Sequence, residues 1–110
     1  MSRPVVYVLQ KHLIRSHTGI RVPKFDLTPA AKFGDLNFIL GPDARGGDPD
    51  AVALIRRGLA DLTEDDYLLP IGSTILISIL GALANERCAR LNFLYWSSSR
   101  EDYVVTTHEF

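Results

Sequence analysis

The sequence has little cysteine: Cys88 is the only one among 110 residues. A single thiol excludes an intramolecular disulfide and any metal site built from several cysteines. A chain without disulfides is typical of a reducing compartment. We therefore expect a protein that folds through its apolar core alone, with no structural metal and no other cofactor.

Long hydrophobic runs are also absent. The longest mostly apolar stretch covers residues 71–84, which is shorter than the roughly 20 residues needed to span a bilayer. The first residues lead directly into a strand-like run, without the apolar segment and cleavage site of a secretory signal peptide. We therefore expect a soluble, non-secreted, cytoplasmic protein that does not contact a membrane.

The net charge is small, but its distribution is uneven. A formal charge of −1 at pH 7 gives no overall attraction to nucleic acid or membrane. Residues 1–32 carry +5 and the remaining residues carry −6. The basic side chains of the first segment are Arg3, Lys11, Arg15, Arg21, Lys24 and Lys32. This asymmetry predicts a basic surface near the amino terminus.

The composition, 46% apolar and 23% charged, is typical of a single globular domain, which we take to be residues 1–110. Short apolar runs predict strands at residues 5–9, 36–40, 67–71, 91–96 and 103–107. Helical patterns cover residues 48–61 and 74–86. Strands that alternate with helices favour a parallel sheet. The expected fold is α/β, a single small domain with a mixed sheet of about five strands, two main helices and a C-terminal β-hairpin.

Turn and cap residues mark the element boundaries. The sequence His17-Thr18-Gly19 predicts a hairpin turn with positive φ at Gly19, so that residues 10–24 form a basic hairpin or arm. Thr28 is expected to cap a one-turn helix that Gly34 closes. The pairs Asp48-Pro49 and Ser73-Thr74 are expected to cap the two main helices.

The helix expected at residues 74–86 is apolar nearly all round, which requires cover on more than one side. Gly81 lies in its middle and would permit a close approach by backbone or by a partner. We therefore predict a homodimer or a larger homo-oligomer. The residues expected to mediate this self-association are Ile75, Ile79, Gly81 and Leu83.

The chain resembles a group of small tailed-bacteriophage proteins. The likeness rests on residues 62–72 (LTEDDYLLPIG), the apolar helix that follows, and the pattern formed by Leu94, Trp96 and Tyr103. The sequence departs from the group at Ser73, where Asp-Pro usually follows the glycine. The resemblance implies a phage origin and a place in the host cytoplasm. Because the group has no established activity, the resemblance carries over no catalytic residue.

Several polar residues could form a site, but each has a simpler structural interpretation. Ser73 beside Gly72 could hold an anion or a nucleotide, although a plain helix cap explains it. Asp65 and Asp66 are adjacent and would point to opposite faces, which favours a solvated turn with one turn cap. The three histidines lack metal-site spacing, and residues 97–99 suit a hairpin turn.

The basic arm is the strongest candidate site. Its cations, Lys11, Arg15, Arg21 and Lys24, could bind phosphate groups or an acidic protein, or could be solvated or pack on the chain's own acidic surface. The aromatic residues near the C-terminal hairpin could anchor an interface, but core packing is the favoured interpretation for them. They are Tyr95, Trp96 and Tyr103.

No convergent catalytic set is visible in the sequence. We therefore expect a non-enzymatic phage accessory protein that binds a host protein and assembles with itself. The alternative is a nucleic-acid-binding protein that uses the basic arm. A third hypothesis is an enzyme or nucleotide-binding protein with its site around Gly72 and Ser73.

Overall fold

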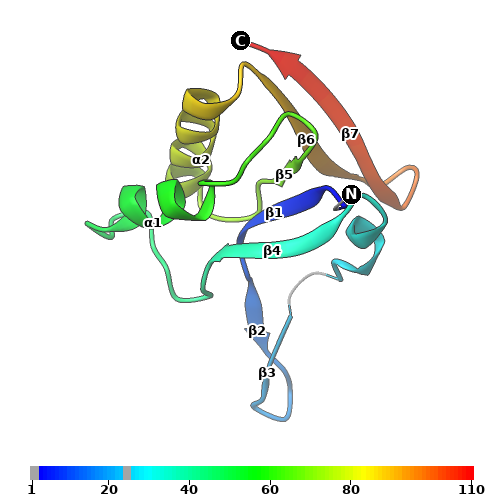
Figure 1. Ribbon diagram of the computed structural model, residues 1–110. Helices are drawn as coiled ribbons and strands as arrows, with labels where there is room; N and C mark the ends of the chain where they lie inside the picture. Colours follow the sequence, from blue (N-terminus) through cyan, green and yellow to red (C-terminus); the bar gives the residue numbers. More distant parts are fainter. Residues whose placement is uncertain (1–2, 24–25) are drawn as a thin grey trace.

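The computed structural model describes residues 3–23 and 26–110, and its centre is a five-stranded mixed sheet (Figure 1). The strands are β1 (Val5–Gln10), β4 (Asp35–Leu40), β5 (Tyr67–Leu69), β6 (Arg90–Ser97) and β7 (Asp102–Glu109). They lie in the order β4-β1-β5-β6-β7, with β7 antiparallel to β6 and the other neighbours parallel. The helices are α1 (Ala51–Gly58) and α2 (Thr74–Arg87). The α/β fold predicted from the sequence is confirmed, including its C-terminal hairpin.

The central strand β1 is buried on both faces. Tyr7 and Leu9 belong to the apolar core beneath α1 and α2, whereas Val6 and Val8 belong to a second core on the opposite face. That second face is covered by the short 3-10 helix η1 (Thr28–Lys32). A parallel strand covered on both sides is a continuous apolar run, which is how the sequence indicated it.

Helix α2 begins and packs largely as expected. The Leu76 N–H donates a 3.3 Å hydrogen bond to Ser73 Oγ, so Ser73 is the N-cap. The residues of α2 that are buried in the core are Leu76, Leu80, Leu83 and Ala84. Gly81 differs from the expectation, because no heavy atom of the described residues lies within 4 Å of the place where its Cβ would be. The chain's own backbone therefore does not approach α2 there.

Helix α1 is shorter than predicted and is not capped by Asp48. It covers Ala51–Gly58, and its N-cap, Asp50, makes no side-chain cap bond. Asp48 Oδ2 instead accepts a 2.8 Å hydrogen bond from the Arg45 N–H. The Asp48 side chain closes a turn in the preceding loop, which is the local alternative that aspartate offers to a helix cap.

Two expectations for residues 28–34 are wrong. Thr28 lies inside η1, whose N-cap is Leu27, and its own N–H donates to Asp26 Oδ1 at 3.0 Å. Gly34 is not a left-handed helix end. A Cβ at Gly34 would lie 2.2 Å from the Pro4 carbonyl oxygen, so this glycine is needed where β4 approaches the start of β1.

The C-terminal aromatic residues divide between core and surface. Tyr103 is 6% exposed, and its ring meets that of Trp96 edge-on, with the centroids 5.2 Å apart. Trp96 and Tyr95 are 49% and 51% exposed. Core packing is therefore correct for Tyr103 and wrong for Tyr95 and Trp96, because these two residues lie near the carboxyl end of β6, past the residues that pair with β5.

Candidate binding surface: the hairpin arm

The most prominent surface feature is a two-stranded hairpin that projects from the body of the molecule (Figure 1). It consists of β2 (Leu13–Arg15) and β3 (Arg21–Pro23), which pair only with each other. We call residues 13–23 the arm. Its turn has φ of +85° at Gly19, whose N–H donates to the Ser16 carbonyl at 2.9 Å. The predicted hairpin is thus confirmed.

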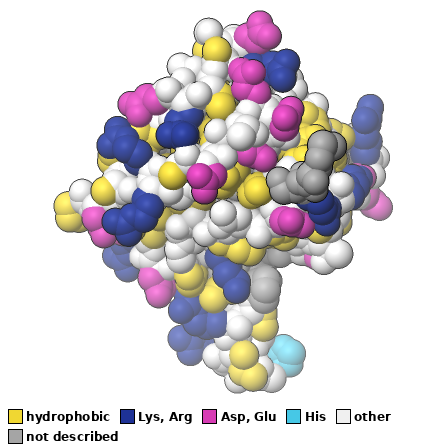
Figure 2. All heavy atoms as spheres, viewed as in Figure 1, with side chains coloured by type: hydrophobic (Ala, Val, Ile, Leu, Met, Phe, Trp, Pro, Cys, Tyr) yellow, Lys and Arg dark blue, Asp and Glu magenta, His cyan; other side chains and the backbone are white. Residues whose placement is uncertain are grey.

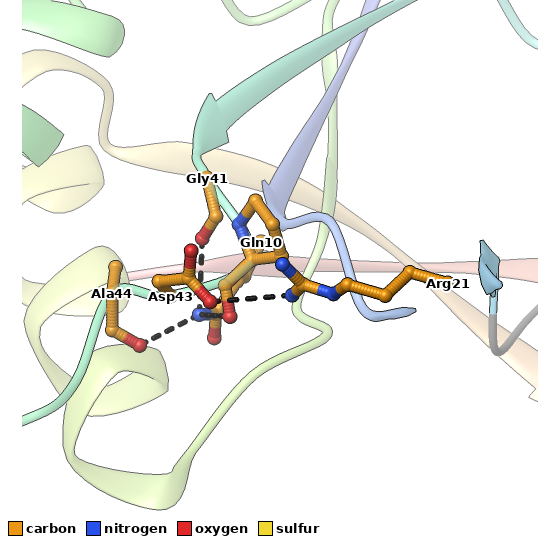
Figure 3. A network of polar contacts seen from close by, with 6 residues as sticks. Gln10, Arg21, Gly41, Asp43 and Ala44 are labelled. Carbon is orange, nitrogen blue, oxygen red and sulfur yellow. Dashed lines mark hydrogen bonds and ion pairs between the residues drawn. The ribbon is translucent and has the colours of Figure 1, made fainter. Parts of the chain in front are cut away.

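The base of the arm is fixed by one loop, residues 41–44 (Figure 3). Gln10, at the end of β1, is 4% exposed, and its Nε2 donates to the Ala44 and Gly41 carbonyls at 2.7 and 3.2 Å. From the arm, Arg21 Nη2 reaches Asp43 Oδ1 at 3.2 Å. The same loop is therefore attached to the sheet by a buried amide and to the arm by an exposed ion pair, which contributes little stability.

The arm presents both apolar and basic side chains to solvent. Ile14 and Ile20 are 48% and 65% exposed. The strand register places Arg15 directly opposite Arg21, and like charges in that position repel each other. Figure 2 shows lysine and arginine side chains gathered over the arm and its base. The ion pair with Asp43 offsets part of this repulsion at Arg21.

Three of the four predicted basic residues lie on the arm or at its base, and the fourth is not described. Lys11 stands at the base of the arm with its Nζ 5.8 Å from the centroid of the Phe38 ring, and Arg15 and Arg21 form the cross-strand pair described above. Lys24 lies outside the described residues. His12 is at the base of the arm, where its Nε2 is 3.4 Å from Gln10 Oε1.

A groove of about 610 Å³ adjoins the base of the arm. Its lining residues include Lys11, His12, Thr28, Phe38 and Ile71. It runs from η1 and the β4 residues Leu36 and Phe38 to the residues that follow β1 and β5. Open α/β sheets bind ligands outside the carboxyl ends of their strands. No local sequence pattern predicts this groove, because its walls come from segments far apart in the chain.

The expected self-association residues of α2 do not form one exposed face. Ile75 is 58% exposed, whereas Leu83 is only 6% exposed and belongs to the core. Ile79 is half-buried and packs against that core. Leu83 therefore offers no surface to a partner, and Ile75 is the most accessible of the apolar side chains expected to mediate self-association.

The remaining polar candidates serve the fold. Asp66 is 7% exposed rather than solvated, and it accepts hydrogen bonds from the Val5 and Thr63 N–H groups, each at 2.9 Å. Ser97 Oγ accepts from the Arg100 N–H at 3.4 Å within the hairpin turn. Burial raises the pKa of the Cys88 thiol, with the nearby charge of Glu64 adding to this effect. The thiolate, which is the nucleophilic form, is therefore disfavoured.

Within the described ranges 3–23 and 26–110, no three histidine, cysteine, aspartate or glutamate side chains are grouped so that they could hold a metal ion. No helix in these ranges has the length and apolar character to cross a membrane.

Comparison with known protein families matches nearly the whole chain. The family model described as phage Pam3 gp32-like protein matches residues 4–109. No curated protein and no solved structure matches the chain. The family match supports the phage resemblance seen in the sequence, although it does not test the DDYLL motif on which that resemblance partly rested.

Proposed function

The chain belongs to the phage Pam3 gp32-like family, and from this premise we propose that it is a non-enzymatic phage accessory protein that binds a host protein and assembles with itself. The observation that carries the proposal is the arm. A hairpin outside the main sheet, with two isoleucines exposed at 48% and 65%, buries little apolar surface of its own. A partner that covers these side chains removes their apolar surface from water, which stabilises the complex.

The buried polar groups support a role without catalysis. Among the residues that the structure describes, Gln10 and Asp66 are the buried side chains that carry an amide or a carboxylate, and both make hydrogen bonds to backbone groups. Each therefore positions chain segments, and a catalytic acid or base would need its polar atoms directed toward a substrate.

The chemistry of the arm defines the kind of partner surface. On one face of the hairpin Arg15 lies opposite Arg21, and on the other Ile14 lies opposite Val22. A partner that covers both faces of the hairpin would carry carboxylates against the arginines on the first face and an apolar depression for Ile14 or Ile20 on the second. Protein interfaces commonly combine an apolar anchor with charged groups around it.

The proposal is tested by immobilising the protein and capturing partners from lysate of the phage host. The double variant Arg15→Glu with Ile20→Asp should lose the captured protein. Arg100→Glu is the matched control, because Arg100 is equally exposed but lies in the β6–β7 turn, and it should retain that protein. Capture that is indifferent to the arm variant, or no capture by the wild type, would contradict the proposal.

Nucleic acid is the alternative partner, and the Arg15–Arg21 pair is the observation that favours it. Phosphate groups would pair with Arg15 and compete with Asp43 for Arg21, and their binding would weaken steeply with salt. Binding to DNA and RNA at about 50 mM salt, measured by fluorescence anisotropy, distinguishes the two. Salt-sensitive binding that Arg15→Glu removes and Arg100→Glu preserves would identify a nucleic-acid partner.

A further inference from the structure

Strand β7 is an edge strand, and its hydrogen-bonding pattern shows which backbone groups face outward. The Phe110 N–H donates to the Ala89 carbonyl at 2.8 Å, and the β6–β7 register runs without interruption from Arg90↔Glu109 to Ser97↔Asp102. In an antiparallel ladder, hydrogen-bonded and non-hydrogen-bonded pairs alternate. Tyr103, Val105, Thr107 and Glu109 therefore direct their N–H and C=O groups away from β6.

The amino-terminal end of this edge is closed by a side chain. Asp102 Oδ1 accepts a 2.8 Å hydrogen bond from the Tyr103 N–H, and the other carboxylate oxygen of Asp102 pairs with Lys32 of η1. These contacts lower the pKa of Asp102, chiefly through Lys32. The outward N–H of Tyr103 is thus occupied, and the open part of the edge is the segment 105–109.

The open segment has few of the features that protect sheet edges. Its sequence, VTTHE, contains no proline and no lysine, and such residues are common defences against edge-to-edge pairing. Exposed apolar side chains lie in it and next to it: Val105 is 39% exposed and Phe110 is 68% exposed. Tyr95 of β6, which pairs with Val104 of β7, is 51% exposed.

We propose that a second copy of this chain pairs with β7 in antiparallel fashion, with the two-fold axis at Thr107. In this register Thr107 lies opposite Thr107 of the second copy, and Val105 lies opposite Glu109 of the second copy. Every open outward-facing residue then exchanges both of its backbone hydrogen bonds. Phe110 lies opposite Val104 of the second copy, which pairs with Tyr95 of that copy, so these apolar side chains share one face of the joined sheet. Val105 lies on the other face.

Neighbouring registers fit less well. Moving the axis to Thr106 places Glu109 opposite Tyr103 of the second copy, whose N–H already bonds Asp102. Moving it to His108 places the two imidazoles opposite each other and leaves Val105 unpaired. The Thr107 register puts no like charges directly opposite, which matters because such pairs are destabilising. The edge is therefore complementary to itself.

This inference rests on the self-association part of the proposed function and names its surface, which is separate from the arm. It replaces α2 as the interface, because the α2 residue Leu83 is buried in the core. The two proposals can fail separately. Variants of the arm should remain dimeric, and variants of the β7 edge should still capture the host protein.

The oligomeric state is measured by size-exclusion chromatography with light scattering at about 100 µM. The wild type should have twice the mass of the 12.2 kDa chain. Thr107→Pro removes an outward N–H from each copy and keeps the backbone hydrogen bonds to β6, although it loses the bond from Thr107 Oγ1 to Asn92 Oδ1 of β6. It should weaken dimerisation about tenfold to a hundredfold. Thr107→Ala keeps the N–H and is the matched control, which should remain dimeric.

A disulfide test covers the case in which Thr107→Pro fails to fold. Opposed residues of a hydrogen-bonded pair have Cα atoms about 5.5 Å apart, a separation that permits a disulfide. Thr107→Cys should therefore crosslink into a covalent dimer under mild oxidation. Val105→Cys should not, because its counterpart in the second copy would be displaced by about 13 Å along the strand.

Three results would overturn the proposal. One is a wild type of monomer mass throughout, and another is efficient crosslinking of Val105→Cys but not of Thr107→Cys. The third is a dimer that Ile75→Asp dissociates while Thr107→Pro leaves it intact, which would return the interface to α2.

Discussion

At the scale of single residues, the Asp66 carboxylate connects two segments that are far apart in the sequence. One oxygen accepts from the Val5 N–H at 2.9 Å, and the other accepts from the Thr63 N–H and hydroxyl at 2.9 and 3.1 Å. Val5 begins β1, whereas Thr63 lies in the turn before β5. The carboxylate therefore holds the start of the central strand against the turn that leads to its neighbour.

Replacing Asp66 should destabilise the fold strongly. In Asp66→Asn the amide nitrogen would meet an N–H donor, and hydrogen bonds to a charged acceptor contribute about 1.5–3 kcal/mol each. We expect a loss of about 2–3 kcal/mol in the free energy of unfolding, measured by urea denaturation.

Asp65→Asn is the matched control for Asp66→Asn. Asp65 is exposed, and the one hydrogen bond found for it is donated by its backbone N–H. Its replacement should change the stability by less than about 0.5 kcal/mol. Equal losses for the two variants would show that the Asp66 carboxylate does not have this structural role.

At the scale of elements, the pairing of β1 with β4 depends on a close approach at Gly34. The Asp35 N–H donates to the Pro4 carbonyl at 3.0 Å, and the ladder then runs from Val5↔Asp35 to Gln10↔Leu40. A side chain at Gly34 would collide with the same carbonyl that anchors the ladder.

Gly34→Ala should therefore destabilise the protein by about 1–3 kcal/mol, the usual range for an overpacked site. Gly41→Ala is the matched control, because no heavy atom of the described residues lies within 4 Å of the place where its Cβ would be. Alanine also lowers the conformational entropy of the unfolded chain relative to glycine. This variant should be neutral or slightly stabilising. Thermal unfolding of both variants tests this, and a stable Gly34→Ala protein would contradict the steric argument.

At the scale of the whole molecule, stability should differ between the body and the arm. The body has an apolar core on each face of its sheet. The arm has two strands of three residues, and an exposed ion pair ties it to the 41–44 loop. Segments with few buried contacts open locally without global unfolding.

Limited trypsin digestion should cleave the arm first, after Arg15 or Arg21. Arg57 is the internal reference, because it is also exposed but lies in helix α1. Mass spectrometry of the first fragments identifies the cleaved bonds. Cleavage at Arg57 as early as in the arm would mean that the arm is as well protected as the body.

The sequence alone determined the elements and their kinds. The apolar runs located the main strands, and proline, glycine and the Ser73 cap marked several of their boundaries. The spacing of apolar residues and the residue types in turns are local properties, so neighbouring residues in the sequence are enough to recognise them. The alternation of strands and helices also predicted a largely parallel sheet with an antiparallel end, since crossover geometry leaves few alternatives.

Only the tertiary structure decided which side chains are buried and which surfaces stay open. Asp66 is buried while Trp96 is half exposed, the reverse of what their types suggest. Contacts between distant segments settle this outcome: Asp66 accepts a hydrogen bond from the Val5 N–H, whereas Trp96 lies on β6 past the residues that pair with β5. The surroundings of a side chain depend on segments distant in the chain, and a local pattern carries no information about them.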